Sequence, residues 1–410
     1  MTVASTERPR LRTSVDVMGV RHDEEPLMVL YDASGLVPGT VTLTPGAMFL
    51  VTLMNGQNTL NDIAARFAQR FKQPLPIGQL VGMLHQLDRA GMLDSPVFEA
   101  RYEEMTRRYR QAPERRSQTP MDPGAVDKLR SDLTAMLSEG QVVTDGQKVV
   151  GLLAPHLDYA RGRPCYASAY AQLRGQEAID RFVILGTNHF GRSTTAVWTT
   201  KDYHTPLGVA RTDREFLRRL QERCGADLGE RELDHLREHS AELQVMVLQA
   251  LRGSQPFEIV PVLCPDACGP TGLDPADGIG PGLDTFADAL ADVLSNEAAT
   301  NGKRTCVIAG ADLSHVGRRF GDDRDLDDAF LHAVEQQDRA ALARIQAGDA
   351  DGLVADLRAA ENPYRVCSGG CLYVLLRVLR GSQVRMLSYH QAVDREHHTG
   401  VTCAAAVLVK

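Results

Sequence analysis

The chain has 410 residues, which exceeds one average domain of roughly 150 residues and predicts two or three domains. Hydrophobic residues make up 43% and charged residues 24% of it, as in ordinary globular proteins, and no apolar run approaches the ~18 residues of a membrane span. The formal net charge of −8 argues against broad nucleic-acid binding, because contacts with phosphates need a concentrated basic surface.

The start of the chain and its cysteines indicate the compartment. Basic residues near the N-terminus are not followed by the apolar segment of a secretory signal. The 8 cysteines are too dispersed for a disulfide scaffold, so reduced thiols are expected. We therefore expect a cytoplasmic protein.

Residues 1–110 are predicted to form a small winged-helix module. An Asn55-Gly56 turn leads into an amphipathic helix, and Thr59 and Asp62 have the spacing of a capping pair. A second helix with one apolar face is expected over 77–90.

The segments 53–56, 59–67 and 84–93 resemble those of PqqD-like modules, which bind precursor peptides in peptide-modification systems. The resemblance implies a peptide-binding role for residues 1–110. The alternatives are a winged-helix domain that packs on its neighbour or forms a dimer, and a DNA-binding domain. The second alternative is disfavoured because neither helix is markedly basic.

Residues 111–125 are polar, rich in proline and arginine, and lack apolar periodicity. This composition is typical of an interdomain linker. The arginine-rich residues 101–116 overlap this segment, and we interpret them as a charged helix and linker, with a patch that binds nucleic acid or another anion as the alternative.

Residues 126–410 are predicted to form an α/β domain with a central mixed sheet flanked by helices. Short apolar runs alternate with helical patterns, an order typical of a sheet covered on both faces. Two further strands, expected to be antiparallel, flank a histidine-rich turn at 395–400. The clearest strand patterns are 149–154, 182–185, 259–263 and 306–309, and the clearest helical patterns are 165–173, 214–222, 241–251, 283–294, 325–360 and 374–379.

Three of these strands run directly into turns that carry metal-ligand residue types. The first leads to His156, the second to His189, and the last to Asp312 and His315. Because ligands gather at the carboxyl ends of strands in open α/β sheets, we expect these side chains to converge. Two imidazoles and a carboxylate suit iron, copper, zinc or manganese, and this set is used by open non-haem iron sites. A single histidine would more often be structural, so the prediction rests on the repeated position.

Two further segments carry candidate groups. His239 and Glu242 share one face of an expected helix at i and i+3 and could present a base and an acid to the cleft. The alternative is a polar helix start capped by Ser240. Cys367 precedes a Ser-Gly-Gly segment at the start of an apolar stretch, where backbone amides could face the site.

Several familiar motifs are absent. The chain contains no HExxH, GxxxxGKS/T or GxGxxG motif, and its two CxxxC pairs do not continue into a cluster-binding pattern. The sequence therefore predicts neither a phosphate-binding loop nor an iron–sulfur cluster.

Five ordered motifs resemble those of the MEMO family, whose bacterial members include proteins called AmmeMemoRadiSam system protein B. They extend over about residues 147–410 in the family order. The motifs are Pro155-His156-Leu157-Asp158-Tyr159 with Arg161-Gly162, Leu185-Gly186-Thr187-Asn188-His189, Thr205-Pro206-Leu207-Gly208, Glu238-His239-Ser240-Ala241-Glu242 and Asp312-Leu313-Ser314-His315.

The resemblance implies a fold similar to that of class III extradiol dioxygenases, which hold catalytic Fe(II) with two histidines and an acid. Position by position, it implies that His156 and His189 bind the metal. Asp312, His315 and His239 correspond to residues of the same cleft and are expected to act in catalysis. The residues expected to bind substrate are Asp158, Asn188, Ser314 and Cys367.

The third metal ligand stays open at this point. Some animal relatives have a cysteine ligand where this chain has Ser314, and a serine hydroxyl is a poor ligand for iron or copper. Asp312 or His239 could take the position, or the metal could stay more open to water and substrate.

The resemblance implies one divalent metal ion, with Fe(II) expected first and Cu or Zn as alternatives. The expected function is a redox or oxygenase-like reaction on a small or peptide-borne substrate. The family name implies a radical SAM protein and an AMMECR1-like protein as partners, and no contact with nucleic acid or membrane is expected. The alternative is a non-catalytic peptide- or metal-binding module of the same system.

Overall fold

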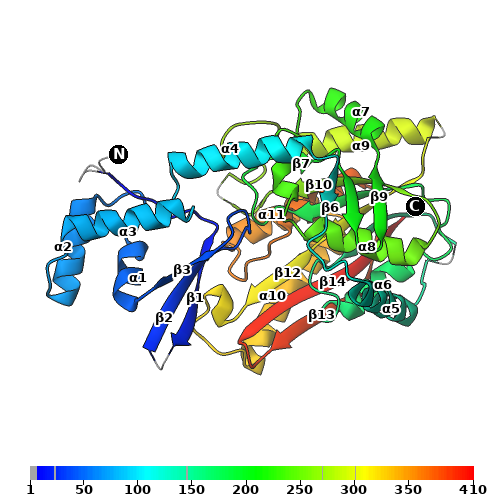
Figure 1. Cartoon of the computed structure of the whole chain (residues 1–410). Helices are drawn as coiled ribbons and strands as arrows, with labels where there is room; N and C mark the ends of the chain where they lie inside the picture. Colours follow the sequence, from blue (N-terminus) through cyan, green and yellow to red (C-terminus); the bar gives the residue numbers. More distant parts are fainter. Residues whose placement is uncertain (1–6, 23–24, 145, 270, 301) are drawn as a thin grey trace. The chain divides into compact units, whose positions relative to one another are not determined.

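The computed structural model describes residues 7–22, 25–144, 146–269, 271–300 and 302–410 (Figure 1). The chain divides into two compact units, Met1–Gln111 and Ala112–Lys410, and each unit has its own hydrophobic core. None of the described helices combines the length and the apolar character that crossing a bilayer requires.

The first unit contains an antiparallel sheet with the strand order β1-β2-β3, followed by helices. The expected capping pair is present: the Thr59 side chain accepts from the Asp62 amide, and the Asp62 carboxylate accepts from the Thr59 amide. The winged-helix assignment and the peptide-binding role stay predictions. The elements are β1 (Val15–His22), β2 (Glu25–Asp32), β3 (Thr40–Leu43), α1 (Pro45–Thr52), α2 (Leu60–Phe71), α3 (Ile77–Arg89) and α4 (Pro96–Gln111).

The second unit is built on one mixed sheet, which has eleven strands among the described residues. Strands β5, β11, β6 and β10 are parallel neighbours, and the antiparallel hairpin β13–β14, red in Figure 1, continues the sheet beyond β5. The expected α/β architecture with a mixed sheet is confirmed. In spatial order the strands are β12 (Asp312–Val316), β14 (Thr399–Val409), β5 (Val149–Ala154), β11 (Thr305–Gly310), β6 (Arg181–Thr187), β10 (Glu258–Cys264), β9 (Gly208–Thr212), β8 (Asp202–Thr205) and β4 (Glu114–Arg116), with β13 (Gln383–Asp394) beside β14 and β7 (Val197–Trp198) beside β10.

Helices cover both faces of this sheet, because successive residues of each buried strand point to opposite sides. In β6, Phe182 and Ile184 belong to one core cluster, whereas Val183 and Leu185 belong to the other. The first cluster includes residues of α5 (Pro123–Glu139), α6 (Arg163–Ala171) and α8 (Ser240–Arg252), and the second includes residues of α7 (Arg214–Cys224), α9 (Leu283–Ala299), α10 (Asp328–Gln346), α11 (Ala350–Ala359) and α12 (Gly369–Val378).

Two helical predictions differ from the structure in their bounds. The stretch 325–360 forms two helices, α10 and α11, because Gly348 adopts φ 67° and the Asp349 side chain caps α11 by accepting from the Gly352 amide at 2.9 Å. The helix expected over 374–379 begins at Gly369. Glycines are poor helix formers, so propensity places this start too late.

Residues 112–125 of the segment expected to be a linker belong to the second unit. Strand β4 lies within it and pairs in parallel with β8, and helix α5 begins at Pro123 with Asp122 as its cap. The only buried side chain of β4 is that of Arg115, which is 0% exposed. An edge strand of three residues with a buried arginine has no apolar periodicity, so composition alone could not detect it.

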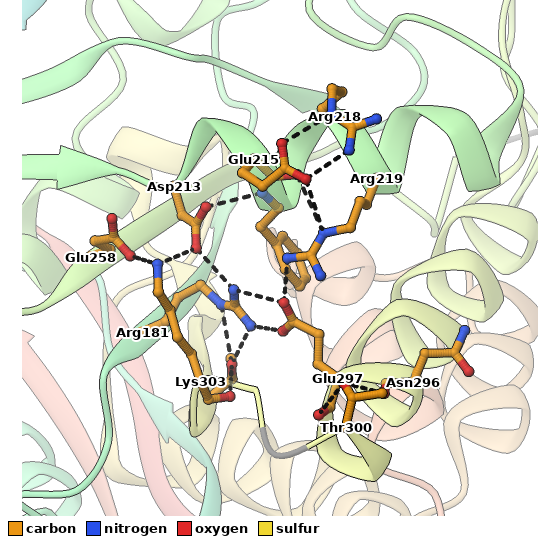
Figure 2. A network of polar contacts seen from close by, with 12 residues as sticks. Arg181, Asp213, Glu215, Arg218, Arg219, Glu258, Asn296, Glu297, Thr300 and Lys303 are labelled. Carbon is orange, nitrogen blue, oxygen red and sulfur yellow. Dashed lines mark hydrogen bonds and ion pairs between the residues drawn. The ribbon is translucent and has the colours of Figure 1, made fainter.

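The amino end of β6 carries a network of charged side chains (Figure 2). The Arg181 guanidinium is fully buried and donates to Asp213 at 2.9 Å and to Glu297. Lys303 contacts Asp213 at 3.0 Å, and Arg219 also pairs with Glu297. Asp213 and Glu297 therefore each meet two cations.

Candidate metal centre

The carboxyl ends of three neighbouring parallel strands bring the predicted residues together. His156 stands two positions after β5, His189 two positions after β6, and Asp312 two positions after β11, which lies between the other two strands. The ring centroids of His156 and His189 are 4.8 Å apart, with the ring planes almost perpendicular. The expected convergence of these side chains is therefore present in the structure.

The His156 ring is held in one tautomer by its surroundings. Its Nδ1 lies 2.9 Å from the carbonyl oxygen of Gly310, and a carbonyl oxygen can only accept, so Nδ1 carries the proton. Nε2 is then left with a free lone pair, as a metal ligand requires. The His156 side chain is 2% exposed, which keeps this ring in place.

The His189 ring is oriented by the Glu238 carboxylate. Nδ1 of His189 lies 3.1 Å from both Glu238 oxygens, and the His189 amide donates to the same carboxylate at 3.0 Å. Burial alone would lower the pKa of His189, but the adjacent Glu238 and Cys367 outweigh it and raise the pKa well above its ordinary value. Burial would raise the pKa of Glu238, and His189 reverses that effect and holds it well below its usual range. Such a carboxylate–histidine pair leaves Nε2 available to a metal.

The Cys367 thiol completes a group of three ligand atoms. Its Sγ lies 3.5 Å from Nε2 of His156, and one ligand atom each from His156, His189 and Cys367 lie within 4.8 Å of one another. Burial would raise the pKa of the Cys367 thiol, but the imidazoles of His156 and His189 outweigh it and lower the pKa to about 6. The thiolate is therefore the favoured form near neutral pH.

Close packing of helix α12 places Cys367. A Cβ on Gly370 would lie 2.2 Å from the Pro265 carbonyl oxygen, and a Cβ on Gly369 would lie 2.8 Å from the Cys268 sulfur. Ser368 anchors the same point, because its hydroxyl accepts from the Asp312 amide at 3.1 Å and lies 3.1 Å from the Thr187 hydroxyl. Only glycines allow α12 to begin this close to the loop after β10.

Helix α8 begins equally close to the sheet. A Cβ on Gly186 would lie 2.6 Å from the Ser240 hydroxyl oxygen, and a Cβ on Gly310 would lie 2.8 Å from Nε2 of Gln244. The glycines of β6 and β11 thus let the turn before α8 bring Glu238 up to His189.

Asp312 lies beside the three ligand atoms. Its carboxylate accepts from the His156 amide at 3.0 Å, and its other oxygen is 3.6 Å from Nε2 of His156. Burial raises the pKa of Asp312 to about 6. The group can therefore exist as an acid or as a base near neutral pH.

The two remaining histidines lie at different depths. The His239 side chain is 49% exposed, and its ring stacks on that of His189 with centroids 5.1 Å apart. His315 is turned toward the backbone, with Nδ1 3.1 Å from the Leu313 oxygen and 3.2 Å from the Arg365 oxygen. Burial lowers the pKa of both, to about 4 for His239, so both are neutral at pH 7.

The side chains of three residues expected to bind substrate make hydrogen bonds within the protein, and their role toward substrate stays a prediction. The Asn188 amide donates to Asp234 at 2.9 Å and braces the loop after β6. The Asp158 carboxylate accepts from the Arg161 amide at 3.1 Å. The Ser314 hydroxyl donates to the buried carboxylate of Asp338 on α10 at 2.7 Å. The segment of Ser314 was expected to be a turn, but it forms strand β12, which pairs with β14.

Two features of the site were not predicted. Cys367 was expected to bind substrate, yet its sulfur lies within the group of ligand atoms. Glu238 was not selected, although an acid directly before His239 was visible in the sequence. For Cys367 the signal was the Cys-Ser-Gly-Gly segment before an apolar helix.

The donor set fits one metal ion. Ligand distances of about 2.0–2.1 Å for imidazole and about 2.3 Å for thiolate are within reach of atoms that already lie within 4.8 Å of one another. A four-coordinate ion held by these three side chains would keep one position for a small molecule, as in catalytic rather than structural sites.

The family profile described as "Memo-like protein" matches residues 123–409. The MEMO1 family protein of Aquifex aeolicus is 26% identical over 289 residues, which cover 69% of this chain and 71% of the relative. That of Thermus thermophilus is 25% identical over 352 residues, 86% of this chain and 98% of the relative. The second unit, Ala112–Lys410, makes up less than 86% of the chain. The match with the Thermus protein therefore extends into the first unit. Since the profile spans most of the chain, the protein belongs to the Memo-like family.

Proposed function

We propose that the chain is a metal-dependent oxidoreductase that holds one metal ion with His156, His189 and Cys367. The observation that carries the proposal is that their ligand atoms lie within 4.8 Å of one another at the carboxyl edge of the sheet. A thiolate between two imidazoles is a favourable ligand set for a metal ion, whereas purely structural histidines do not need one.

The metal proposed is Fe(II), with Cu and Zn as the alternatives. Two imidazoles with one thiolate are softer than two imidazoles with a carboxylate, and this shift strengthens copper and zinc as competitors. A bound redox-active ion would supply electron transfer to a small or peptide-borne substrate or to dioxygen.

The protein groups around the metal position have separate tasks. Asp312 lies 3.6 Å from Nε2 of His156 and is placed to exchange a proton with a molecule at the open position. His239 stacks on His189 and is half-exposed, so its ring is accessible to solvent beside the metal position. Asp312 is shielded from bulk water by its burial.

Metal content measured after purification without chelator tests the first step. The full chain should retain about one metal ion, and His156→Ala and His189→Ala should each lose most of it. His397→Ala is the matched control, because His397 is exposed in the turn between β13 and β14 and its ring pairs with Asp394. Equal metal content in all four proteins would refute the proposal.

The extension of the Thermus match into the first unit supports a role for that unit in the same system. We propose that it delivers a peptide and that a radical SAM protein and an AMMECR1-like protein are the partners. If the protein is instead a non-catalytic peptide- or metal-binding module, the loaded chain will bind peptide and consume no dioxygen or other oxidant. Measurement of oxidant consumption with and without Asp312→Asn separates the two functions.

A further inference from the structure

Strand β4 buries one charged side chain beneath the turn that supports the metal centre. Arg115 is 0% exposed, and β4 holds it there by pairing Arg115 with Tyr203 of β8. The guanidinium carbon lies 4.8 Å from the centre of the Tyr203 ring. β4 precedes residues 123–409, the segment that matches the family profile.

The three nitrogens of the guanidinium each bind a different group of the turn 235–242. Nε donates to the His235 carbonyl oxygen at 2.8 Å, and Nη2 donates to the Glu238 carbonyl oxygen at 2.7 Å. Nη1 pairs with the Glu242 carboxylate. That carboxylate also accepts from the Ser117 hydroxyl, just beyond β4. A planar fork of donors meets all three acceptors at once, which an ammonium group cannot do.

The same turn presents the carboxylate that orients His189. The Glu238 side chain accepts from the amides of His239 and Ser240 at 2.9 Å and contacts both the amide and Nδ1 of His189. Arg115 therefore fixes the Glu238 backbone from one side, while the Glu238 side chain fixes His189 on the other.

We propose that Arg115 is a positioning residue of the metal centre, which acts on His189 through the backbone and side chain of Glu238. Its contribution to metal binding rests on the function proposed above, whereas its hold on the turn does not. The metal centre accordingly depends on β4, which precedes the residues matched by the family profile.

Metal affinity of the full chain tests the proposal, with Co²⁺ as the probe. Arg115→Met removes the donors and should weaken Co²⁺ binding about tenfold, in the range seen when a partner of a ligand is lost. It should also change the visible absorption of the bound Co²⁺, which reports ligand geometry. Arg115→Lys should recover part of the affinity. Arg116→Met is the matched control, because Arg116 is the next residue of β4 and its side chain is 76% exposed. This substitution should leave the Co²⁺ affinity and the absorption spectrum unchanged.

Hydrogen exchange of the metal-free protein provides a second readout. The amides of His189, His239 and Ser240, all bound to Glu238, should exchange faster in Arg115→Met than in the wild type and in Arg116→Met. If Arg115→Met does not fold, Arg115→Lys and Glu242→Gln take its place in both measurements. Unchanged exchange at these amides in the folded variants would overturn the inference. If the wild type binds no Co²⁺, the proposed function fails, and the exchange rates alone decide the role of Arg115.

Discussion

At its first residue β6 carries Arg181, and two positions past its last residue the chain carries His189. Around Arg181 the cations and carboxylates pair with one another. Burial would raise the pKa of Asp213, but the Phe216 amide, Lys303 and Arg181 outweigh it and lower the pKa to about 2. Around His189 the ligand atoms of three residues lie within 4.8 Å of one another. In the first cluster the charged side chains pair with one another. In the second cluster the ligand atoms remain available to a metal ion.

The comparison teaches how stability and binding can be separated on one strand. In a cluster whose charges pair with one another, removal of one partner leaves a buried charge with less compensation, and this destabilises the fold. A cluster with converging ligand atoms gains most from an added cation. Substitutions at the two ends of β6 should therefore affect different measurements.

The largest expected effect on stability is at the amino end. Arg181→Met should lower the free energy of unfolding by about 3 kcal/mol, because Asp213 and Glu297 lose a buried cation and keep only the partly exposed Lys303 and Arg219. Unfolding in urea can be followed by fluorescence of Trp198, the single tryptophan, which lies in the second unit. Arg218→Met on α7 is the exposed control and should change it by less than about 0.5 kcal/mol. A loss of metal affinity in Arg181→Met would contradict the separation.

The reverse pattern is expected at the carboxyl end. Cys367→Ser should weaken metal binding at least about 100-fold, since loss of a ligand exceeds the 10- to 100-fold cost of losing a partner of a ligand. The unfolding free energy of the metal-free protein should change by less than about 1 kcal/mol. Cys224→Ser on α7 controls for loss of a thiol. Equal affinities of the two variants would remove Cys367 from the ligand set.

A buried histidine in the segment before α8, His235, should give the second unit a pH dependence. His235 accepts from the Tyr203 hydroxyl at 3.0 Å and donates to the Val197 carbonyl at 3.1 Å, and burial lowers its pKa to about 3. The unfolded chain, with a histidine pKa of about 6.5, binds the proton more readily. The contribution of His235 to the free energy of unfolding is therefore fully present above about pH 6.5. It is lost as the pH falls toward 3.

Protonation of His235 in the unfolded chain should lower the free energy of unfolding by about 2 kcal/mol between pH 7 and pH 5. His235→Gln should abolish this share in urea unfolding followed by Trp198, whereas His397→Gln should retain it. The same pH slope in all three proteins would exclude His235 as the cause.

The smallest effect concerns the partner of His189. Glu238→Gln keeps a hydrogen-bond acceptor but removes the charge, and it should weaken metal binding about tenfold. Isothermal titration with Zn²⁺ can measure this, with Glu215→Gln on the exposed face of α7 as control. An unchanged affinity would show that orientation by a carboxylate is not required.

The sequence predicted the parts of the site that follow a local rule. Strand β5 was predicted at its observed bounds, and His156 and His189 were selected because each follows a buried strand. Cys367 could not be identified as a ligand in the same way. It reaches the site from the segment before α12, and which loop reaches the edge of a sheet depends on contacts between distant residues such as Gly370 and Pro265.

Ser314 illustrates the limit of motif comparison. Its position beside Asp312 suggested a role near the metal, but pairing of β12 with β14 turns its hydroxyl toward Asp338. Arg115 was overlooked for a different reason, since a charged residue in a short polar segment carries no sign of burial until its three acceptors are known.

Strand β4 also has a mechanical consequence. Only two residues separate the end of α4 at Gln111 from the start of β4 at Glu114, and β4 is an edge strand of three residues. Tension along the chain from the first unit would therefore load β4 before any other strand, and Arg115 would carry that load directly to the turn of Glu238.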